Sequence, residues 1–464
     1  MDWLGSASAQ HFDVGGLRGS APAAGSATTH TARALRRARH GKGWRLRGCH
    51  DCGLFSRLPP SIPGMDCRCP RCGALLRRDW QSPLAAPLAL AGAGLILCAA
   101  ALTTPFMSLR LLGQVRGSTV DSGAWVFVDD GLWTLALVLT ATVVLVPLLR
   151  LSLRLVVLGG LALRHPPRWL YRPLRWHGLL NAWSMLEIFL FSTLIAYTRL
   201  ASLADVQLGP AIYALAILVL IMIAADMAFE PQAAWDALES RGITATPGPL
   251  PAPPRHAAPP AILACPCCHH VAHAPDGTPC PRCGTRLCHR KPASLSRCWA
   301  LIAAATILYV PANLYPVMTI VTAGHSEAHT ILGGIAAFVA TGSWSLATVV
   351  FVASVIVPLL KLAALATMLL QIARRSSSSL RRRTKLYRLI EFVGRWSMID
   401  VFIVSVLVAL VRFGIVASIT AEIGAACFGA VVVLTMLAAA TFDPRLMWDA
   451  AGIGDRVPEQ AVVQ

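Results

Sequence analysis

Charged residues are scarce in this sequence. Of its 464 residues, 14% are Asp, Glu, Lys or Arg, whereas 55% are hydrophobic. A soluble domain carries roughly 25% charged residues, so the composition argues against an ordinary soluble protein and favours an integral membrane protein. Acidic residues are fewer than basic residues, with 23 Asp and Glu against 41 Lys and Arg.

Several motifs are also missing, and each absence argues against a function. The P-loop pattern Gly-x4-Gly-Lys-Ser/Thr does not occur, so any transport must draw its energy from an ion gradient or a partner. No nucleophile with its base and no open metal site stands out, which argues against an enzyme. The basic runs lack the interleaved aromatic residues that stack on bases, so the net charge of +18 does not indicate nucleic-acid binding. Residues 1–43 contain no apolar core of signal-peptide length, and we expect a disordered basic tail in the cytoplasm.

The sequence contains an internal repeat of one unit. Trp183–Phe189 reads Trp-Ser-Met-Leu-Glu-Ile-Phe, and Trp396–Phe402 reads Trp-Ser-Met-Ile-Asp-Val-Phe. Landmarks on both sides recur at a nearly constant spacing, among them Pro105 with Pro316, Trp133 with Trp344 and Pro147 with Pro358. A repeat of about half the chain indicates duplication of a whole domain, because solenoid repeats are only about 20–50 residues long.

Two groups of four cysteines precede the two halves. Pairs of Cys-x2-Cys knuckles at this spacing are typical of tetrahedral metal sites, and closed four-cysteine sites are usually structural zinc. Iron in a rubredoxin-like site and thiol or disulfide redox chemistry are the alternatives, although a cytoplasmic location disfavours disulfides. We expect two small ribbons that need their metal to fold, and we leave out the spare cysteines Cys67, Cys267 and Cys288. The expected ligands are Cys49, Cys52, Cys69 and Cys72 in the first ribbon, and Cys265, Cys268, Cys280 and Cys283 in the second.

Runs of about 20 apolar residues predict eight membrane spans, four in each half. The arginine-rich segments 150–175 and 374–388 are expected to be loops, and the positive-inside rule places them, both ribbons and both termini in the cytoplasm. Because four spans return the chain to its starting side, the two halves would be parallel repeats. The predicted spans are Leu84–Met107, Leu132–Leu149, Leu179–Thr198, Gly209–Phe229, Cys298–Met318, Trp344–Leu370, Leu389–Val411 and Gly424–Phe442.

These observations predict an all-α polytopic membrane protein with two parallel four-helix repeats, each preceded by a small cytoplasmic zinc ribbon of rubredoxin-like type. The Pro-rich linker between the halves would let the second ribbon sit under its own bundle. The predicted divisions are a tail (1–43), ribbon 1 (44–80), transmembrane repeat 1 (81–240), a linker (241–262), ribbon 2 (263–292), transmembrane repeat 2 (293–450) and a C-terminal tail (451–464).

Polar residues inside the apolar runs are the candidate functional groups. An acid near the middle of a membrane costs about 2.5–3.5 kcal/mol, so Glu187 and Asp400 are either neutral and hydrogen-bonded or sites that bind and release protons. Arg150 and Lys361 form a second repeated pair, each just after a Val-Pro step. Arg150 would either reach the cytoplasmic headgroups or contribute to a polar contact with a carbonyl freed by the proline. Lys361 would either reach the headgroups or lie buried against Asp400 or Glu391. The repeated serines Ser184 and Ser397 complete the candidate transport and coupling residues.

Together these motifs resemble the paraquat-inducible protein A family of bacterial inner-membrane proteins. The resemblance rests on the paired cysteine knuckles, on Pro311–Met318, on Val-Pro-Leu-Leu-Lys361, on the repeated Trp-Ser-Met motif and on the Phe-acid-Pro endings at Phe229 and Phe442. It covers residues from about 44 to 450. The first half departs from the family pattern, because Thr103–Met107 replaces the fuller Asn-x-x-Pro-x-Met form, so the two halves need not act alike.

The resemblance implies a function that composition does not show. It implies a membrane subunit of an MCE-type system that moves phospholipids or other lipophilic molecules between membranes, together with an MCE-domain periplasmic partner that spans the periplasm. The alternative is a scaffold, or a zinc or redox sensor, without transport activity. A membrane enzyme is the third and weakest interpretation.

Overall fold

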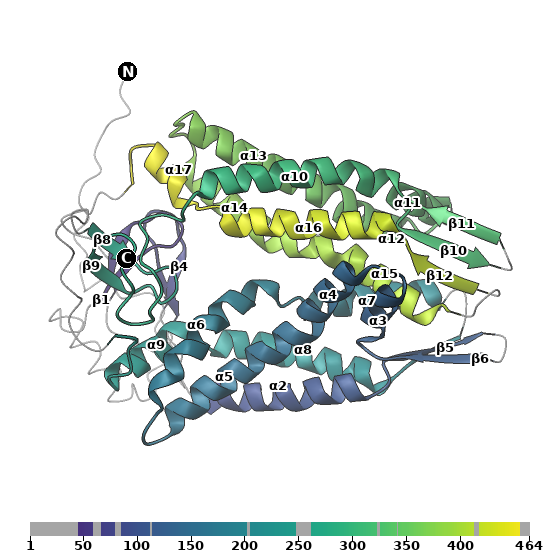
Figure 1. Cartoon of the computed structure of the whole chain (residues 1–464), viewed down its shortest axis with the longest axis horizontal. Coiled ribbons are helices and arrows are strands. Elements are labelled where there is room, and N and C mark those ends of the chain that lie inside the picture. Colours follow the sequence, from purple (N-terminus) through teal and green to yellow (C-terminus); the bar gives the residue numbers. More distant parts are fainter. Residues whose placement is uncertain are drawn as a thin grey trace, which may run out of the picture.

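The computed structural model describes residues 45–58, 66–78, 85–111, 114–201, 205–246, 261–322, 325–340, 342–412 and 417–454. The predicted tail at 1–43, most of the linker and most of the C-terminal tail lie outside these residues. Two helical bundles lie side by side, with the cysteine ribbons at one end and two small sheets at the other (Figure 1). We call these the ribbon end and the sheet end.

The two bundles follow the same order of elements. Within the described residues, eight helical segments are long and apolar enough to span a membrane, four in each half, as the sequence predicts. The helices of the first half are α2 (Ala85–Thr103), α3 (Ser122–Asp129), α4 (Trp133–Thr140), α5 (Val146–Ala162), α6 (Tyr171–Leu180), α7 (Leu186–Leu200), α8 (Pro210–Ala228) and α9 (Pro231–Ser240). Those of the second half are α10 (Ser294–Leu314), α11 (Ile331–Ala340), α12 (Trp344–Phe351), α13 (Val357–Ala373), α14 (Leu380–Gly394), α15 (Ile399–Leu410), α16 (Ile423–Thr441) and α17 (Arg445–Ala450).

A π-helical turn precedes the repeated proline in each half. These turns are η2 (Ala141–Leu145) before Pro147 and η5 (Val352–Ile356) before Pro358. Proline lacks the N–H that an α-helix needs at this point, and one wider turn is a common way to accommodate the missing bond. The second span of each half is therefore continuous but locally widened.

The third span of each half is broken where the repeated motif begins. A 3₁₀ turn, η4 (Asn181–Trp183), separates α6 from α7, and another, η6 (Arg395–Met398), separates α14 from α15. Glu187 and Asp400 consequently stand in the first turns of α7 and α15, where the helix dipole favours an acid. The apolar run predicts one uninterrupted helix through each motif, so the 3₁₀ turn before each acid was not predicted.

The arginine-rich segments were wrongly predicted to be loops. Residues 150–162 belong to α5, residues 171–175 begin α6, and α14 begins at Leu380. The third and seventh spans extend over Arg168–Thr198 and Leu380–Leu410, so both begin earlier than predicted. Their first turns are amphipathic and arginine-bearing, which hid them from a count of apolar residues.

Each half also carries a three-stranded antiparallel sheet that the sequence did not predict. In the first half β7 (Asp205–Leu208) joins the hairpin of β5 (Met107–Leu111) and β6 (Gln114–Ser118). In the second half β12 (Ala417–Ala421) joins β10 (Met318–Thr322) and β11 (His325–His329) in the same arrangement. The all-α description therefore holds for the spans but not for the sheet end.

The halves are joined through α15, which packs against α7 and α3 of the first half. The two copies of the repeated motif meet here: the Phe189 and Phe402 rings are 5.6 Å apart, and Ser192 Oγ donates to the Ile399 carbonyl at 3.1 Å. Nearer the sheet end, Arg412 pairs with Asp130 at 2.6 Å. One large apolar core consequently includes side chains from both halves.

Candidate functional site

The first ribbon brings its four predicted ligands together. Its strands are β1 (Arg45–Gly48) paired with β2 (Phe55–Leu58), and β3 (Asp66–Arg68) paired with β4 (Leu75–Arg78). All four cysteines are buried, and their sulfurs lie within 4.8 Å of one another. The Sγ atoms of Cys49 and Cys72 are 3.5 Å apart, as are those of Cys52 and Cys69.

The second ribbon repeats this arrangement with β8 (Ala261–Ala264) paired with β9 (Val271–Ala274). Cys265 and Cys283 have their sulfurs 3.4 Å apart, and Cys268 and Cys280 have theirs 3.6 Å apart. A tetrahedral zinc with Zn–S bonds of about 2.3 Å would hold its sulfurs about 3.8 Å apart. Both groups therefore fit one tetrahedral metal ion each.

The turn after each knuckle has the backbone conformation that such a site needs. A residue with positive φ follows Cys52, Cys72, Cys268 and Cys283; it is glycine in three cases and His269 in the fourth. After Cys49, for example, the N–H of Gly53 donates to the Cys49 carbonyl at 3.0 Å. The left-handed turn closes the knuckle and keeps the sulfurs convergent.

The apolar cores of the two ribbons are exchanged between the bundles, whereas ribbon 2 was predicted to sit under its own bundle. Ribbon 2 keeps a polar contact with its own half, because Arg290 pairs with Asp449 of α17 at 2.6 Å. Ribbon 1 shares an apolar core with α14 and α17 of the second half, and Arg388 of α14 pairs with its Asp51 at 2.5 Å and donates to the Cys72 carbonyl at 3.0 Å. Ribbon 2 shares a core with α6 and α9 of the first half, where its Arg282 pairs with Asp236.

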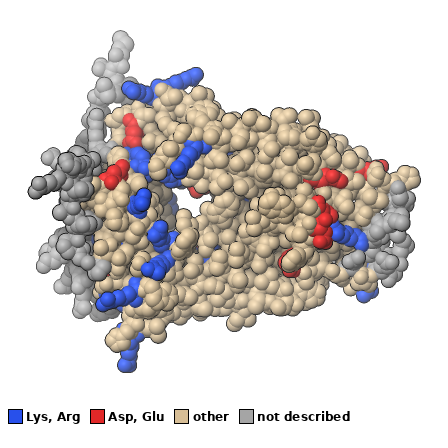
Figure 2. Space-filling model, in the orientation of Figure 1, with Lys and Arg blue, Asp and Glu red and all other residues tan. Residues whose placement is uncertain are grey.

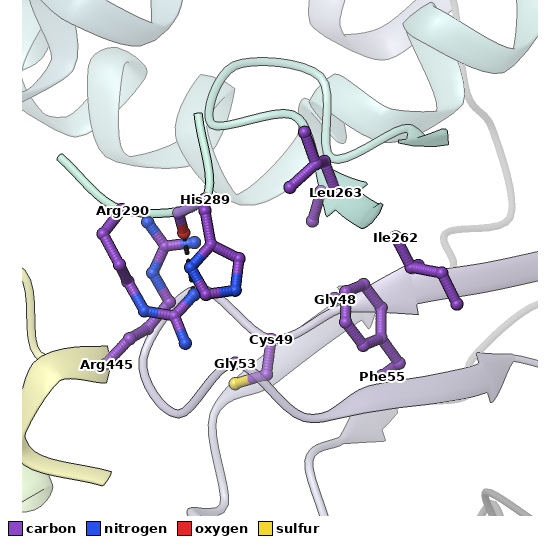
Figure 3. Close-up of a pocket in the computed structure, with 10 residues that line it drawn as sticks. Gly48, Cys49, Gly53, Phe55, Ile262, Leu263, His289, Arg290 and Arg445 are labelled. Atoms are coloured by element: carbon purple, nitrogen blue, oxygen red, sulfur yellow. Dashed lines mark hydrogen bonds between the residues drawn. The ribbon is translucent and has the colours of Figure 1, made fainter. Parts of the chain in front are cut away.

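The ribbons also touch each other. A small pocket lies between them, lined by Gly48, Cys49 and Phe55 on one side and by Ile262 and Leu263 on the other (Figure 3). Arg290 and Arg445 close one end of it, and Arg290 donates to the carbonyl of His289 at 2.7 Å, the dashed line in Figure 3.

Polar contacts tie the ribbons together and to the helices. The rings of His50 and His269 approach to 6.0 Å, and burial together with His50 and Arg47 lowers the pKa of His269 to about 4. Ribbon 1 keeps a secondary contact with α9, because Arg45 pairs with Asp236 at 2.8 Å. The ribbons and the helix ends therefore form one connected unit.

Within the second bundle, three predicted residues lie along one polar seam, which we define as Ser354, Lys361, Ser397 and Asp400. Lys361 is buried against Gly394, where an added Cβ would lie 2.8 Å from Nζ. Ser354 lies beside the Asp400 carboxyl. Among the described residues, Lys361 Nζ, Ser397 Oγ and Asp400 Oδ2 are buried without a hydrogen-bond partner.

The seam differs from the sequence prediction in one respect. No ion pair joins Lys361 to Asp400 or to Glu391 in the part of the chain that the structure describes. Buried polar groups without partners are rare in folded proteins and call for a functional explanation.

The equivalent residues of the first half are arranged differently. Glu187 is 44% exposed, and its Oε1 lies 4.0 Å from Arg395 of the second half. Within the described ranges, Ser184 Oγ is buried without a hydrogen-bond partner, like its counterpart Ser397. The two acids therefore do not have equivalent surroundings.

Of the two interpretations of Arg150, the structure favours a buried polar partner over contact with the headgroups. Its guanidinium is buried and pairs with Asp226 of α8 at 2.5 Å. Arg154, one turn further along α5, pairs with the same Asp226 oxygen and donates from Nε to His177 Nε2 at 2.7 Å. Sequence reasoning missed Arg154 and His177, although the four-residue spacing of Arg150 and Arg154 placed both on one helical face.

Comparison with known proteins agrees with the two-part architecture. The family described as Paraquat-inducible protein A matches residues 84–239 and again residues 295–452. The chain belongs to this family. The double match covers both bundles, each as a separate copy of the family unit.

Relatives within the family are named for transport. The chain is 32% identical to the Intermembrane transport protein PqiA of Escherichia coli K12 over 407 residues, which is 86% of this chain and 95% of that protein. It is 30% identical to the Lipophilic envelope-spanning tunnel protein A of the same strain, over 88% of this chain and 92% of that one. A Probable intermembrane transport protein of Haemophilus influenzae is 27% identical over 87% of this chain and 96% of that protein. No solved structure matches the chain.

These findings confirm the predicted family and a multi-pass membrane transport protein with cysteine sites suited to metal. The relatives are named as transport proteins and not as enzymes, in line with the absence of a catalytic motif.

Proposed function

We propose that the protein is the inner-membrane subunit of a system that moves phospholipids or other lipophilic molecules between membranes, working with a periplasm-spanning MCE-domain partner. The names of the relatives support transport across the envelope. The resemblance of the motifs supplies the partner class. A hollow between the two bundles, visible in Figure 2 towards the ribbon end, offers a place for a lipophilic molecule next to the bilayer.

The observation that carries the mechanism is the polar seam. Among the described residues, the Lys361 amine and one oxygen of the Asp400 carboxyl are buried without hydrogen-bond partners. Such groups can change their charge with little rearrangement of their neighbours, which suits them to bind and release protons. Lys361 and Asp400 would couple proton movement to a change in the packing of η5 against η6. Glu187 and Ser184 would form the corresponding, more open place in the first half.

Charge supports the orientation. Lys and Arg gather at the ribbon end of the face shown in Figure 2, whereas Asp and Glu are more frequent towards the sheet end. By the positive-inside rule the ribbon end, with both ribbons and both termini, would be cytoplasmic. The cysteine sites would then hold structural zinc in a reducing compartment, with iron as the lesser alternative.

The test replaces Asp400 by Asn, which keeps the size of the side chain and removes its titration. With normal abundance, Asp400→Asn should abolish lipid movement driven by a pH gradient in proteoliposomes that contain the partner. Glu327→Gln removes an acid that is 77% exposed at the sheet end and serves as the matched control. Unchanged lipid movement in Asp400→Asn would remove Asp400 from the coupling role.

A further inference from the structure

The first bundle contains a buried cluster of charges that the seam does not include. We call Arg150, Arg154, His177 and Asp226 the arginine cluster. Both guanidinium groups pair with the same oxygen, Asp226 Oδ1, and the two arginines are 4% and 2% exposed. The ring of Phe229 covers Arg154, with its centroid 5.3 Å from the guanidinium carbon.

The cluster carries one positive charge in excess. Arginine is not deprotonated in proteins, so Arg150 and Arg154 contribute two positive charges. His177 accepts a hydrogen bond from Arg154 through Nε2, so this imidazole is neutral. Asp226 supplies one negative charge, and no other acid among the described residues pairs with either arginine. A net charge buried in an apolar bundle is costly unless something neutralises it.

Two donors of the cluster are also unused. Arg150 Nε and Arg154 Nη1 are buried without a hydrogen-bond partner in the part of the chain that the structure describes. Asp226 stands two residues before the end of α8, and its side chain is 39% exposed, so the cluster is open beside this carboxylate near the ribbon end. An anion would approach the two arginines from this side.

Helix packing alone does not account for the charges. At the same repeat spacing, the second half has Leu365 for Arg154, Ile390 for His177 and Ala439 for Asp226, and all three are buried. The second bundle therefore packs the same helices with apolar side chains at these places. Three of the four cluster members therefore belong to the first half alone, whereas Arg150 has Lys361 as its repeated counterpart.

From this geometry we infer that the arginine cluster binds a phosphate group. Two convergent guanidinium groups with free N–H donors match the oxygens of a phosphate better than those of any uncharged ligand. The phosphate belongs either to a phospholipid headgroup that enters from the ribbon-side leaflet or to free inorganic phosphate. The proposed lipid transport bears on which of these sources is used, but binding itself does not depend on it.

The experiment measures binding to the full-length protein in detergent. The probes are short-chain phosphatidylglycerol, inorganic phosphate, and the matching diacylglycerol, which lacks the phosphate. Arg154→Gln should weaken binding of phosphatidylglycerol about tenfold or more, because a charged donor to phosphate is lost. Arg172→Gln, which removes an exposed arginine of the same bundle, should leave binding unchanged. The diacylglycerol should not bind at the site.

Asp226→Asn separates a phosphate site from a structural ion network. It raises the excess positive charge and removes the competing carboxylate, so phosphate and phosphatidylglycerol should bind more tightly. Weaker binding in folded Asp226→Asn, or unchanged binding in folded Arg154→Gln, would overturn the inference. If Arg154→Gln does not fold, Arg154→Lys and Asp226→Asn still carry the test.

Competition identifies the source of the phosphate. Displacement of the lipid by millimolar inorganic phosphate assigns the site to the free ion, whereas a lipid retained in phosphate buffer assigns it to the headgroup. None of these binding measurements requires transport activity. A negative binding result therefore leaves the transport test of Asp400 unaffected.

Discussion

The exchange of the ribbons predicts that damage to a metal site loosens the other half of the protein. Cys72→Ser removes a ligand of ribbon 1 and should release its contacts with α14, above all the two hydrogen bonds from Arg388 to Asp51 and to the Cys72 carbonyl. Hydrogen bonds to charged groups are worth about 1.5–3 kcal/mol each, and the partial exposure of Arg388 reduces that value. We expect a loss of about 2 kcal/mol in the local opening free energy of α14, which is about a 30-fold rise in amide exchange.

Hydrogen exchange with mass spectrometry in nanodiscs measures this directly. Cys72→Ser should raise exchange at the start of α14 and leave α6 protected. Cys283→Ser, the matched variant in ribbon 2, should do the reverse, since that ribbon packs against α6. If Cys72→Ser raises exchange in α6 and spares α14, each ribbon serves its own bundle and the exchanged arrangement is refuted.

Two further predictions concern single side chains. Gly394→Ala places a Cβ 2.8 Å from Lys361 Nζ and should lower the melting temperature and impair transport, whereas Gly159→Ala, with no heavy atom within 4 Å of its Cβ, should be neutral or slightly stabilising in the same thermal unfolding assay. Burial opposes ionisation of Asp443, but hydrogen bonds from Arg445 and from the backbone at position 291 outweigh it and lower the pKa of Asp443. Its contribution to stability is therefore complete above about pH 4 and lost as the pH falls below that value; Asp443→Asn should flatten the acid limb of a plot of melting temperature against pH, and an unchanged limb would contradict this.

The cysteine groups and the spans could be predicted from the sequence because their signals are local. Cys-x2-Cys spacing determines which sulfurs converge in a knuckle, and a membrane span needs only a run of apolar residues. The repeated Trp-Ser-Met motif also pointed to Glu187 and Asp400 as corresponding positions, and both stand in the first turn of their helices. The break before each acid could not be predicted, because Trp183 and Ser184 are compatible with an unbroken helix.

Features that join distant segments left no such signal. The strand β7 pairs with β5 only after five α-helices, α3 to α7, have intervened, and its four residues show no alternation strong enough to be recognised. The arginine cluster needs α5, α6 and α8 to be placed before Asp226 can be matched with Arg154. Ribbon exchange depends on complementary surfaces, such as Asp51 against Arg388, that no spacing rule connects.

The exchanged ribbons also set an order on biogenesis. Ribbon 1 leaves the ribosome first, but the residues that receive it, Arg388 and Trp448 among them, are synthesised near the end. Its metal site can close early because the four cysteines are close in sequence, so a folded ribbon waits while all eight spans are inserted. Docking of ribbon 1 is consequently a late, post-insertional step, and a chain truncated after the first bundle would present that ribbon without its receiving surface.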